Sequence, residues 1–151
     1  MSLSEAMRLT RAGEYAVRCI MYLSSIGKGN LVSKKEIASK CAIPTHFLSK
    51  IAQELQKAKI LEIKQGPKGG FILTKDPNKL TLLEVIEAII GEIYLNDCIA
   101  HPNQCEASSR CAVHRVWSKA RTQLRNILNS VTFSELVADP RCVPNFDHPE
   151  Q

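Results

Sequence analysis

From Ser33 to Ala58 the chain reads SKKEIASKCAIPTHFLSKIAQELQKA, which contains the clearest fold signal in the sequence. Ser33 is placed to cap a short helix, with Glu36 at the third helical position to complete a capping box. Pro44 is expected at the first position of a second helix. The apolar residues of this second helix recur at helical spacing and are Phe47, Leu48, Ile51, Ala52, Leu55 and Ala58. Two helices joined by a turn of three or four residues form the helix-turn-helix pattern.

The residues on either side of this pattern extend it to a winged form. Residues 10–26 carry apolar side chains at helical spacing, and glycines follow directly. Residues 60–64 have a strand-like pattern, a Gly-Pro-Lys-Gly-Gly turn covers 66–70, and a second strand is expected over 71–73. The predicted fold class is therefore mainly α with a small β-hairpin wing, with a winged helix-turn-helix domain over residues 1–80.

The rest of the chain divides into four segments. A connecting helix is expected within residues 81–95, opened by a capping box of Thr81 and Glu84. Residues 96–111 are a polar loop rich in cysteine, and residues 112–139 hold a long helix and a short C-terminal helix. Residues 140–151, with three prolines, are expected to be an irregular tail.

The long helix is predicted over residues 112–131 and has an apolar face opposite a basic one. The apolar face consists of Val113, Val116, Trp117, Ala120, Leu124, Ile127, Leu128 and Val131. A winged-helix body leaves such a face little to pack on, so a partner-binding element is favoured over packing within its own chain.

Charge is distributed unevenly along the chain. Of a net charge of +5, the stretch from Lys28 to Lys75 contributes more than the whole, whereas residues 81–111 are acidic. The basic stretch suits a polyanion such as double-stranded DNA. No apolar run is long enough for a membrane span and no secretory signal is visible, so we expect a cytoplasmic protein with no membrane partner. An enzyme is not expected, because nucleotide-binding glycine patterns and nucleophile–base pairs are missing from the sequence.

Polar side chains on the second helix and on the wing are the expected DNA contacts. A recognition helix needs an apolar side that seats it on the domain and polar side chains that reach base edges or phosphates. The candidates are Thr45, His46, Ser49, Lys50 and Gln53 on the helix, with Lys64, Gln65 and Lys68 on the wing. Gly66, Gly69 and Gly70 are expected to let the wing approach the DNA backbone closely.

Three cysteines and a histidine are concentrated in residues 96–114: Cys98, Cys105, Cys111 and His114. In a reducing compartment such a cluster favours metal binding or redox sensing over disulfides. The alternatives are an iron-sulfur cluster, a zinc ion, or a thiol switch without metal. Structural zinc sites bring ligands in close pairs, so the wide spacing here fits a multi-iron cluster better. The other cysteines, Cys19, Cys41 and Cys142, are expected to be buried or incidental.

Four motifs together resemble one known family. They are MRLTRAGEYAVR at residues 7–18, Ile43-Pro44 with FLSKI at 47–51, GPKGGF at 66–71, and the three-cysteine loop. In combination they resemble the bacterial Rrf-type family of winged-helix transcriptional regulators, over residues 7–133. The resemblance implies a homodimer in which the long helix of each subunit crosses to its partner. It also implies a cluster loop whose state changes DNA affinity.

The resemblance also implies a ligand set. By position, Cys98, Cys105 and Cys111 match the three cluster cysteines of the family. The fourth ligand is either His114, as in IscR-like members with a 2Fe-2S cluster, or Glu14, as in NsrR-like members where an N-terminal carboxylate reaches the partner's cluster. A 2Fe-2S cluster is favoured over 4Fe-4S. The chain differs from the family pattern by six rather than five residues between its first two loop cysteines, and by six residues before Met7.

The sequence thus predicts a homodimeric transcriptional regulator that binds promoter operators and senses iron-sulfur cluster status, redox state or nitric oxide. The alternatives are a zinc- or thiol-regulated winged-helix repressor and an iron-sulfur electron carrier.

Overall fold

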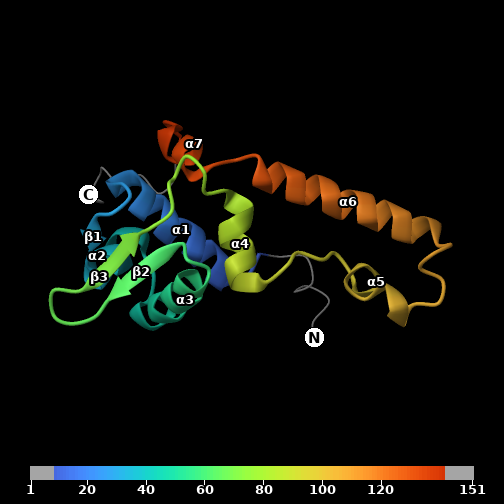
Figure 1. The fold of residues 1–151 in the computed structure, drawn as a ribbon, viewed down its shortest axis with the longest axis horizontal. Helices are drawn as coiled ribbons and strands as arrows, with labels where there is room; N and C mark the ends of the chain where they lie inside the picture. The colour runs from blue at the N-terminus through green and yellow to red at the C-terminus, as the bar shows by residue number, and fades with distance from the viewer. Residues whose placement is uncertain (1–8, 142–151) are drawn as a thin grey trace.

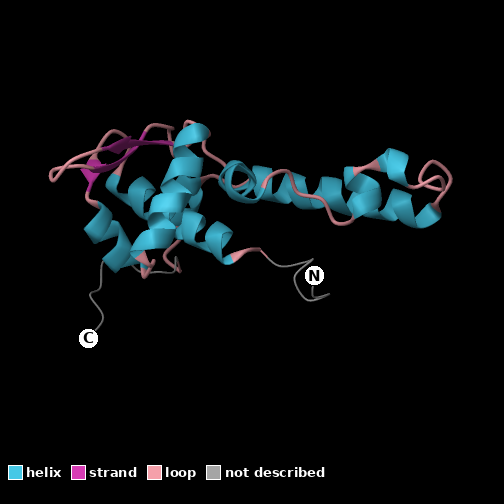
Figure 2. Cartoon of the chain, turned by 90° about the horizontal axis from the view of Figure 1, so that it is seen from below, coloured by secondary structure: helices cyan, strands magenta, loops and turns pink. Residues whose placement is uncertain are grey.

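The computed structural model describes residues 9–141, which form a helical body and an arm that projects from it (Figure 1, Figure 2). Three parts of the chain discussed above lie outside these residues: the segment before Met7, the residue Cys142, and most of the predicted irregular tail. No helix within the described range is long and apolar enough to cross a membrane. The fold-class prediction is confirmed, since the body is mainly helical with a small antiparallel sheet.

Three helices form the first part of the body: α1 (Arg11–Ile26), α2 (Lys34–Cys41) and α3 (Thr45–Lys57). The Thr10 hydroxyl caps α1 by accepting from the Gly13 amide at 3.1 Å, and the Ser33 hydroxyl caps α2 by accepting from the Glu36 amide at 3.2 Å. The predicted capping box of α2 is only half formed, because the Glu36 carboxylate accepts from the Tyr22 hydroxyl of α1 instead.

Helices α2 and α3 are joined by the short turn that the helix-turn-helix pattern requires. Ala42 has a left-handed backbone with φ 52°, and the Ile43 amide donates to the Ala38 carbonyl at 3.0 Å. Pro44 occupies the N-cap position of α3 and not its first helical position, so the helix begins one residue later than predicted.

The sheet has three strands in the order β1-β3-β2, all antiparallel. The predicted hairpin is formed by β2 (Leu61–Lys64) and β3 (Gly70–Leu73). A third strand, β1 (Leu31–Val32), was not predicted. At two residues it is too short to show an alternating pattern, and it forms because β3 offers it a free edge.

Helix α4 (Leu82–Ile90) and helix α7 (Phe133–Ala138) complete the body. Both open with capping boxes, Thr81 with Glu84 as predicted and Thr132 with Glu135. Both helices pack on α1, where Val85 and Phe133 are fully buried. The core they share consists of apolar side chains from every part of the body: Ile20, Leu23, Ile37, Leu48, Leu55, Leu73, Leu80, Val85 and Phe133.

The arm consists of α6 (Ala112–Asn129) and the cysteine loop, which contains α5 (Asp97–Ala100) and a 3-10 turn, η1 (Pro102–Gln104). Helix α6 ends two residues earlier than predicted, at a turn that leads into α7. The C-terminal end of α6 lies next to the body and its N-terminal end carries the loop away from it (Figure 1).

Candidate functional site

Helix α3 presents two different faces. Its apolar side chains Leu48, Ile51, Ala52 and Leu55 are buried and seat the helix on the body. The five residues predicted to contact DNA lie on the other side, where Ser49 is half-buried and the remaining four are exposed: Thr45, His46, Lys50 and Gln53. The helix is therefore oriented as a recognition helix requires.

A cleft of about 450 Å³ lies between α3, the β2–β3 wing and the start of α2. It brings Ser49 and Gln53 of α3 together with Lys64 and Gln65 of the wing. The remaining predicted contacts, Thr45, His46, Lys50 and Lys68, are exposed but do not line this cleft.

The cleft also contains Ser33, Lys34 and Lys35, which were not predicted from the sequence as part of the DNA interface. The signal for them was the pair of lysines that directly follows the helix cap in the basic stretch. Lys64 is paired with Glu62 at 2.7 Å, so part of the wing's positive charge is neutralised within the chain. Lys34 and Lys35 thus add positive charge beside a wing whose own positive charge is partly neutralised by Glu62.

Aromatic contacts hold the start of α3. The Phe47 ring meets Tyr15 of α1 edge-on, with centroids 5.6 Å apart, and the His46 ring lies 4.6 Å from Phe47. The Arg18 guanidinium lies 5.6 Å above the Tyr15 ring. These contacts fix the orientation of the exposed His46 from the side of α1.

Two glycines of the wing are required by packing within the chain, and their expected role in close approach to DNA stays a prediction. A Cβ at Gly70 would lie 2.0 Å from the Val32 carbonyl oxygen, and a Cβ at Gly69 would lie 2.1 Å from the Lys64 carbonyl oxygen. Gly66, with φ 99°, has open space around it and is needed for the left-handed turn. Gly69 and Gly70 are therefore required by packing within the chain.

Cys19 and Cys41 are core residues, as predicted. Both are buried, and the Cys41 thiol donates to the Arg18 carbonyl at 3.6 Å. Burial raises the pKa of the Cys41 thiol to about 12 and also raises the pKa of Cys19. Neither side chain is available as a thiolate ligand or nucleophile at neutral pH.

The three loop cysteines occupy the boundaries of the short helical turns in the arm. Cys98 is the second residue of α5, Cys105 follows η1, and Cys111 is the N-cap of α6. All three are half-buried. The Cys98 thiol donates to the Asn96 side-chain oxygen at 3.5 Å, and the Ser108 hydroxyl donates to the carbonyls of Pro102 and Cys105.

The structure does not gather these cysteines into a metal-binding arrangement. Within residues 9–141 no three side chains of the His, Cys, Asp or Glu type come together as a set of metal ligands. His114 lies in the first turn of α6, and its Nδ1 atom is buried with no hydrogen-bond partner among the described residues. Glu14 is an exposed residue of α1. Helix α1 belongs to the body, whereas the loop lies at the far end of the arm (Figure 1).

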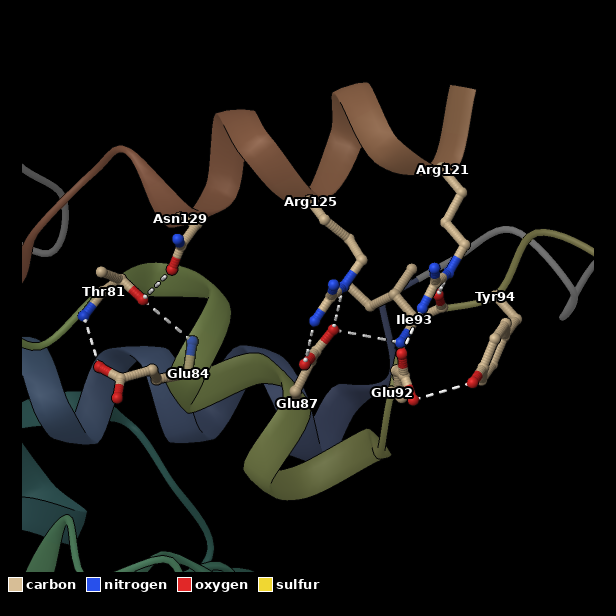
Figure 3. A network of polar contacts seen from close by, with 9 residues as sticks. All are labelled: Thr81, Glu84, Glu87, Glu92, Ile93, Tyr94, Arg121, Arg125 and Asn129. Atoms are coloured by element: carbon tan, nitrogen blue, oxygen red, sulfur yellow. Dashed lines mark hydrogen bonds and ion pairs between the residues drawn. The ribbon is translucent and has the colours of Figure 1, made fainter. Parts of the chain in front are cut away.

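A polar network joins α4 to the middle of α6 (Figure 3). Arg125 donates to both carboxylate oxygens of Glu87, at 2.8 and 3.0 Å. Arg121 donates to the Ile93 carbonyl at 2.7 Å and pairs with Glu92. Hydrogen bonding from Arg125 lowers the pKa of Glu87, and this pair raises the pKa of Arg125 in turn.

This network was not predicted from the sequence. The signal for it was the acidic stretch over 81–111 opposite the arginines of α6, but periodicity alone does not show which helices meet.

The apolar face of α6 is not covered by the chain itself. None of its side chains is buried, and Val113, Val116 and Ile127 are 56%, 64% and 62% exposed. Trp117 and Leu124 are each 36% exposed on the same helix. An apolar stripe of this length in water indicates a surface that another molecule covers.

Three comparisons place this chain among known proteins. The sequence profile named Rrf2, described as an iron-dependent transcriptional regulator, matches residues 9–139. A protein of Aquifex aeolicus (strain VF5) described as an HTH-type transcriptional regulator is 33% identical over 126 residues, covering 82% of this chain and 86% of that protein.

The HTH-type transcriptional regulator IscR of Vibrio parahaemolyticus is 27% identical over 133 residues, covering 88% of this chain and 79% of that protein. The solved structure of CymR, the global cysteine regulator of B. subtilis, shares the fold with a TM-score of 0.69. It is 21% identical and the match covers 87% of this chain and 97% of CymR. The relatives are transcriptional regulators and not enzymes.

Proposed function

Because the chain belongs to the Rrf2 family of transcriptional regulators, we propose that it is a homodimeric DNA-binding regulator whose cysteine loop senses iron-sulfur cluster status. The observation that carries the proposal is the position of the three half-buried thiols. They lie at the end of an arm that connects back to a DNA-reading body.

The DNA-binding surface consists of the polar face of α3 and the cleft beside it. The α3 side chains Ser49 and Gln53 reach base edges in the major groove, while Lys34 and Lys35 at the start of α2 pair with the backbone phosphates. Lys68 at the tip of the wing extends this contact along the duplex. Binding through so many lysines falls steeply as salt concentration rises.

The homodimer forms through the exposed apolar stripe of α6. A two-fold dimer uses the same patch on both subunits, and a continuous stripe on one long helix is self-complementary in this sense. Pairing two copies places two recognition helices at a fixed spacing, as two half-sites on a duplex require. Glu14, exposed on α1, is then also available to the loop of the partner subunit.

The donor set of the loop fits an iron-sulfur cluster. Thiolates are the usual ligands of such clusters, and imidazole nitrogens replace them in some 2Fe-2S sites. Cys98, Cys105 and Cys111 supply the thiolates, and His114, whose Nδ1 has no partner in the described chain, supplies the fourth ligand. When bound, the cluster supplies a redox-active centre that oxidants and nitric oxide can alter.

The chain's own response to ligation is a change of loop shape. Cys98 starts the loop and Cys111 ends it at the N-cap of α6, so ligation of both draws the two ends of the loop toward a common point. Loss of the ligated state releases this constraint. Because α6 carries the dimer surface, the loop state then changes the spacing of the recognition helices and the affinity for the operator.

The test is anaerobic purification followed by quantitation of iron, sulfide and zinc and by visible absorption. The proposal predicts iron and sulfide in the wild type and their loss, with the absorption, in Cys105→Ala. Cys142→Ala, which removes a cysteine outside the loop, serves as the matched control and should keep both. Stoichiometric zinc without sulfide would favour a zinc-regulated repressor, and a protein without either would favour a thiol switch.

A further inference from the structure

Helix α6 is attached to the body at two levels. At its C-terminal end, Thr81 and Thr132 form an antiparallel bridge and the Leu82 amide donates to the Val131 carbonyl at 3.0 Å. The second level is the polar network of Glu87, Glu92, Arg121 and Arg125, which lies partway along the helix (Figure 3). The first attachment fixes the position of the C-terminal end of α6 on the body. The second fixes the direction in which the helix points away from the body.

Glu87 is the centre of this network. Its carboxylate accepts both bonds from Arg125 of α6 and a third bond from the Ile93 amide at 3.3 Å. Glu87 is on α4, the helix whose Val85 is buried against the core of the DNA-reading body. The Glu87 side chain therefore links the arm to the body, because it contacts Arg125 of the arm and belongs to helix α4 of the body.

Arg121 holds the segment that leads into the cysteine loop. Its guanidinium pairs with Glu92, donates to the Ile93 carbonyl, and lies 4.5 Å above the Tyr94 ring. Tyr94 in turn donates to Glu92 at 2.8 Å. Residues 92–94 are thus all held by Arg121 of α6. The last of them, Tyr94, is four positions before Cys98.

The distances along α6 make this attachment a lever. With a rise of about 1.5 Å per residue, Arg125 lies about 6 Å from Asn129, Arg121 about 12 Å, and the helix start at Ala112 about 26 Å. A given rotation about the attached end therefore moves the loop end of α6 about twice as far as Arg121 and about four times as far as Arg125. A displacement of the loop therefore produces a smaller displacement at Arg121 and Arg125. That smaller displacement acts on only a few contacts.

We propose that the network of Glu87, Glu92, Arg121 and Arg125 is the relay through which the state of the cysteine loop reaches the DNA-reading body. The relay rests on the proposed function, since it needs a loop with two states. When residues 92–94 shift, Arg121 moves with them because it contacts them. Glu87, which is hydrogen-bonded to Ile93, transmits this movement to α4 and to α1, on which α4 packs. These are positioning residues, because none of them lines the cleft beside α3 and their hydrogen-bond partners within residues 9–141 include no loop thiol.

The experiment compares Arg121→Gln, Glu87→Gln and the control Lys119→Gln, which alters an exposed α6 lysine outside the network. Full-length protein is prepared in two forms, reconstituted anaerobically with iron and sulfide or stripped with a chelator. The affinity of each form is measured for one duplex selected by the wild-type protein. Hydrogen exchange of residues 91–97 is measured in parallel.

The relay predicts that the ratio of the two dissociation constants shrinks toward one, by about 2- to 30-fold, in Arg121→Gln and Glu87→Gln. The Lys119→Gln protein should keep the wild-type ratio. Exchange of residues 91–97 should rise in the two network variants while that of α1 and α3 stays unchanged, which separates lost coupling from unfolding. Arg121→Lys, which keeps the charge, should restore part of the ratio.

Two results would overturn the proposal in different ways. A wild type that responds to reconstitution, with Arg121→Gln and Glu87→Gln responding equally, overturns the relay and leaves the sensing function standing. A wild type whose two forms bind DNA with the same affinity overturns the sensing function and the relay with it.

Discussion

Replacing Ile127 by alanine should weaken a dimer formed through α6 by a calculable amount. Ile127 is 62% exposed in the single chain, and fully burying such a side chain stabilises by about 1.5–3 kcal/mol. The part still exposed is therefore worth about 1–2 kcal/mol in each subunit. A two-fold interface uses the residue twice, which gives about 2–4 kcal/mol, or roughly a 30- to 700-fold weaker dimer.

Sedimentation velocity over a concentration series measures this dissociation constant directly. Leu31→Ala is the matched control, because Leu31 is 47% exposed but lies on β1 in the body, away from α6. The control should dimerise as the wild type does. If Ile127→Ala and wild type dimerise with equal affinity, or if the wild type is monomeric at micromolar concentration, α6 is not the dimer interface.

Three further outcomes are expected. Replacing Lys50 or Lys68 by alanine should weaken binding to all duplexes alike and reduce the slope of log affinity against log salt by about 1, measured by fluorescence anisotropy; an unchanged slope would exclude a phosphate contact. Phe133→Ala empties a fully buried site beneath α7 and should lower the free energy of unfolding by about 3–5 kcal/mol in urea titrations followed by circular dichroism. Because Arg125 holds the pKa of Glu87 below its ordinary value of 4.5, the stability from this pair should be complete above that pH and decline as pH falls below it. Thermal unfolding from pH 6 down to pH 3 should show this decline in wild type and a shallower one in Glu87→Gln.

The body of the fold could be predicted because its signals are local. The stop of α1 at Gly27, the cap of α4 at Thr81 and the hairpin between β2 and β3 all depend on residues within a few positions. Strand β1 was missed because two residues carry no period, and its pairing depends on a distant edge. The half-formed capping box of α2 was missed for a similar reason, since Tyr22 competes for Glu36 from another helix.

Only part of the candidate site could be predicted as a set of residues, and its arrangement could not be predicted. Helical spacing was enough to place Ser49 and Gln53 on the polar face of α3. Tertiary packing determines that the wing forms a cleft with Lys34 and Lys35. It also determines that residue 70 must be glycine, because the Val32 backbone lies against it. The same holds for the contact of Glu87 with Arg125, which joins residues 38 positions apart.

Ligation in the cysteine loop is expected to change the affinity of the protein for DNA. The most direct measurement is the dissociation constant of one selected duplex for the wild-type protein before and after anaerobic reconstitution with iron and sulfide, alongside Cys105→Ala. We expect the two wild-type values to differ by about 5- to 150-fold and the two Cys105→Ala values to agree. Equal wild-type values, or a Cys105→Ala protein that still responds in full, would contradict it.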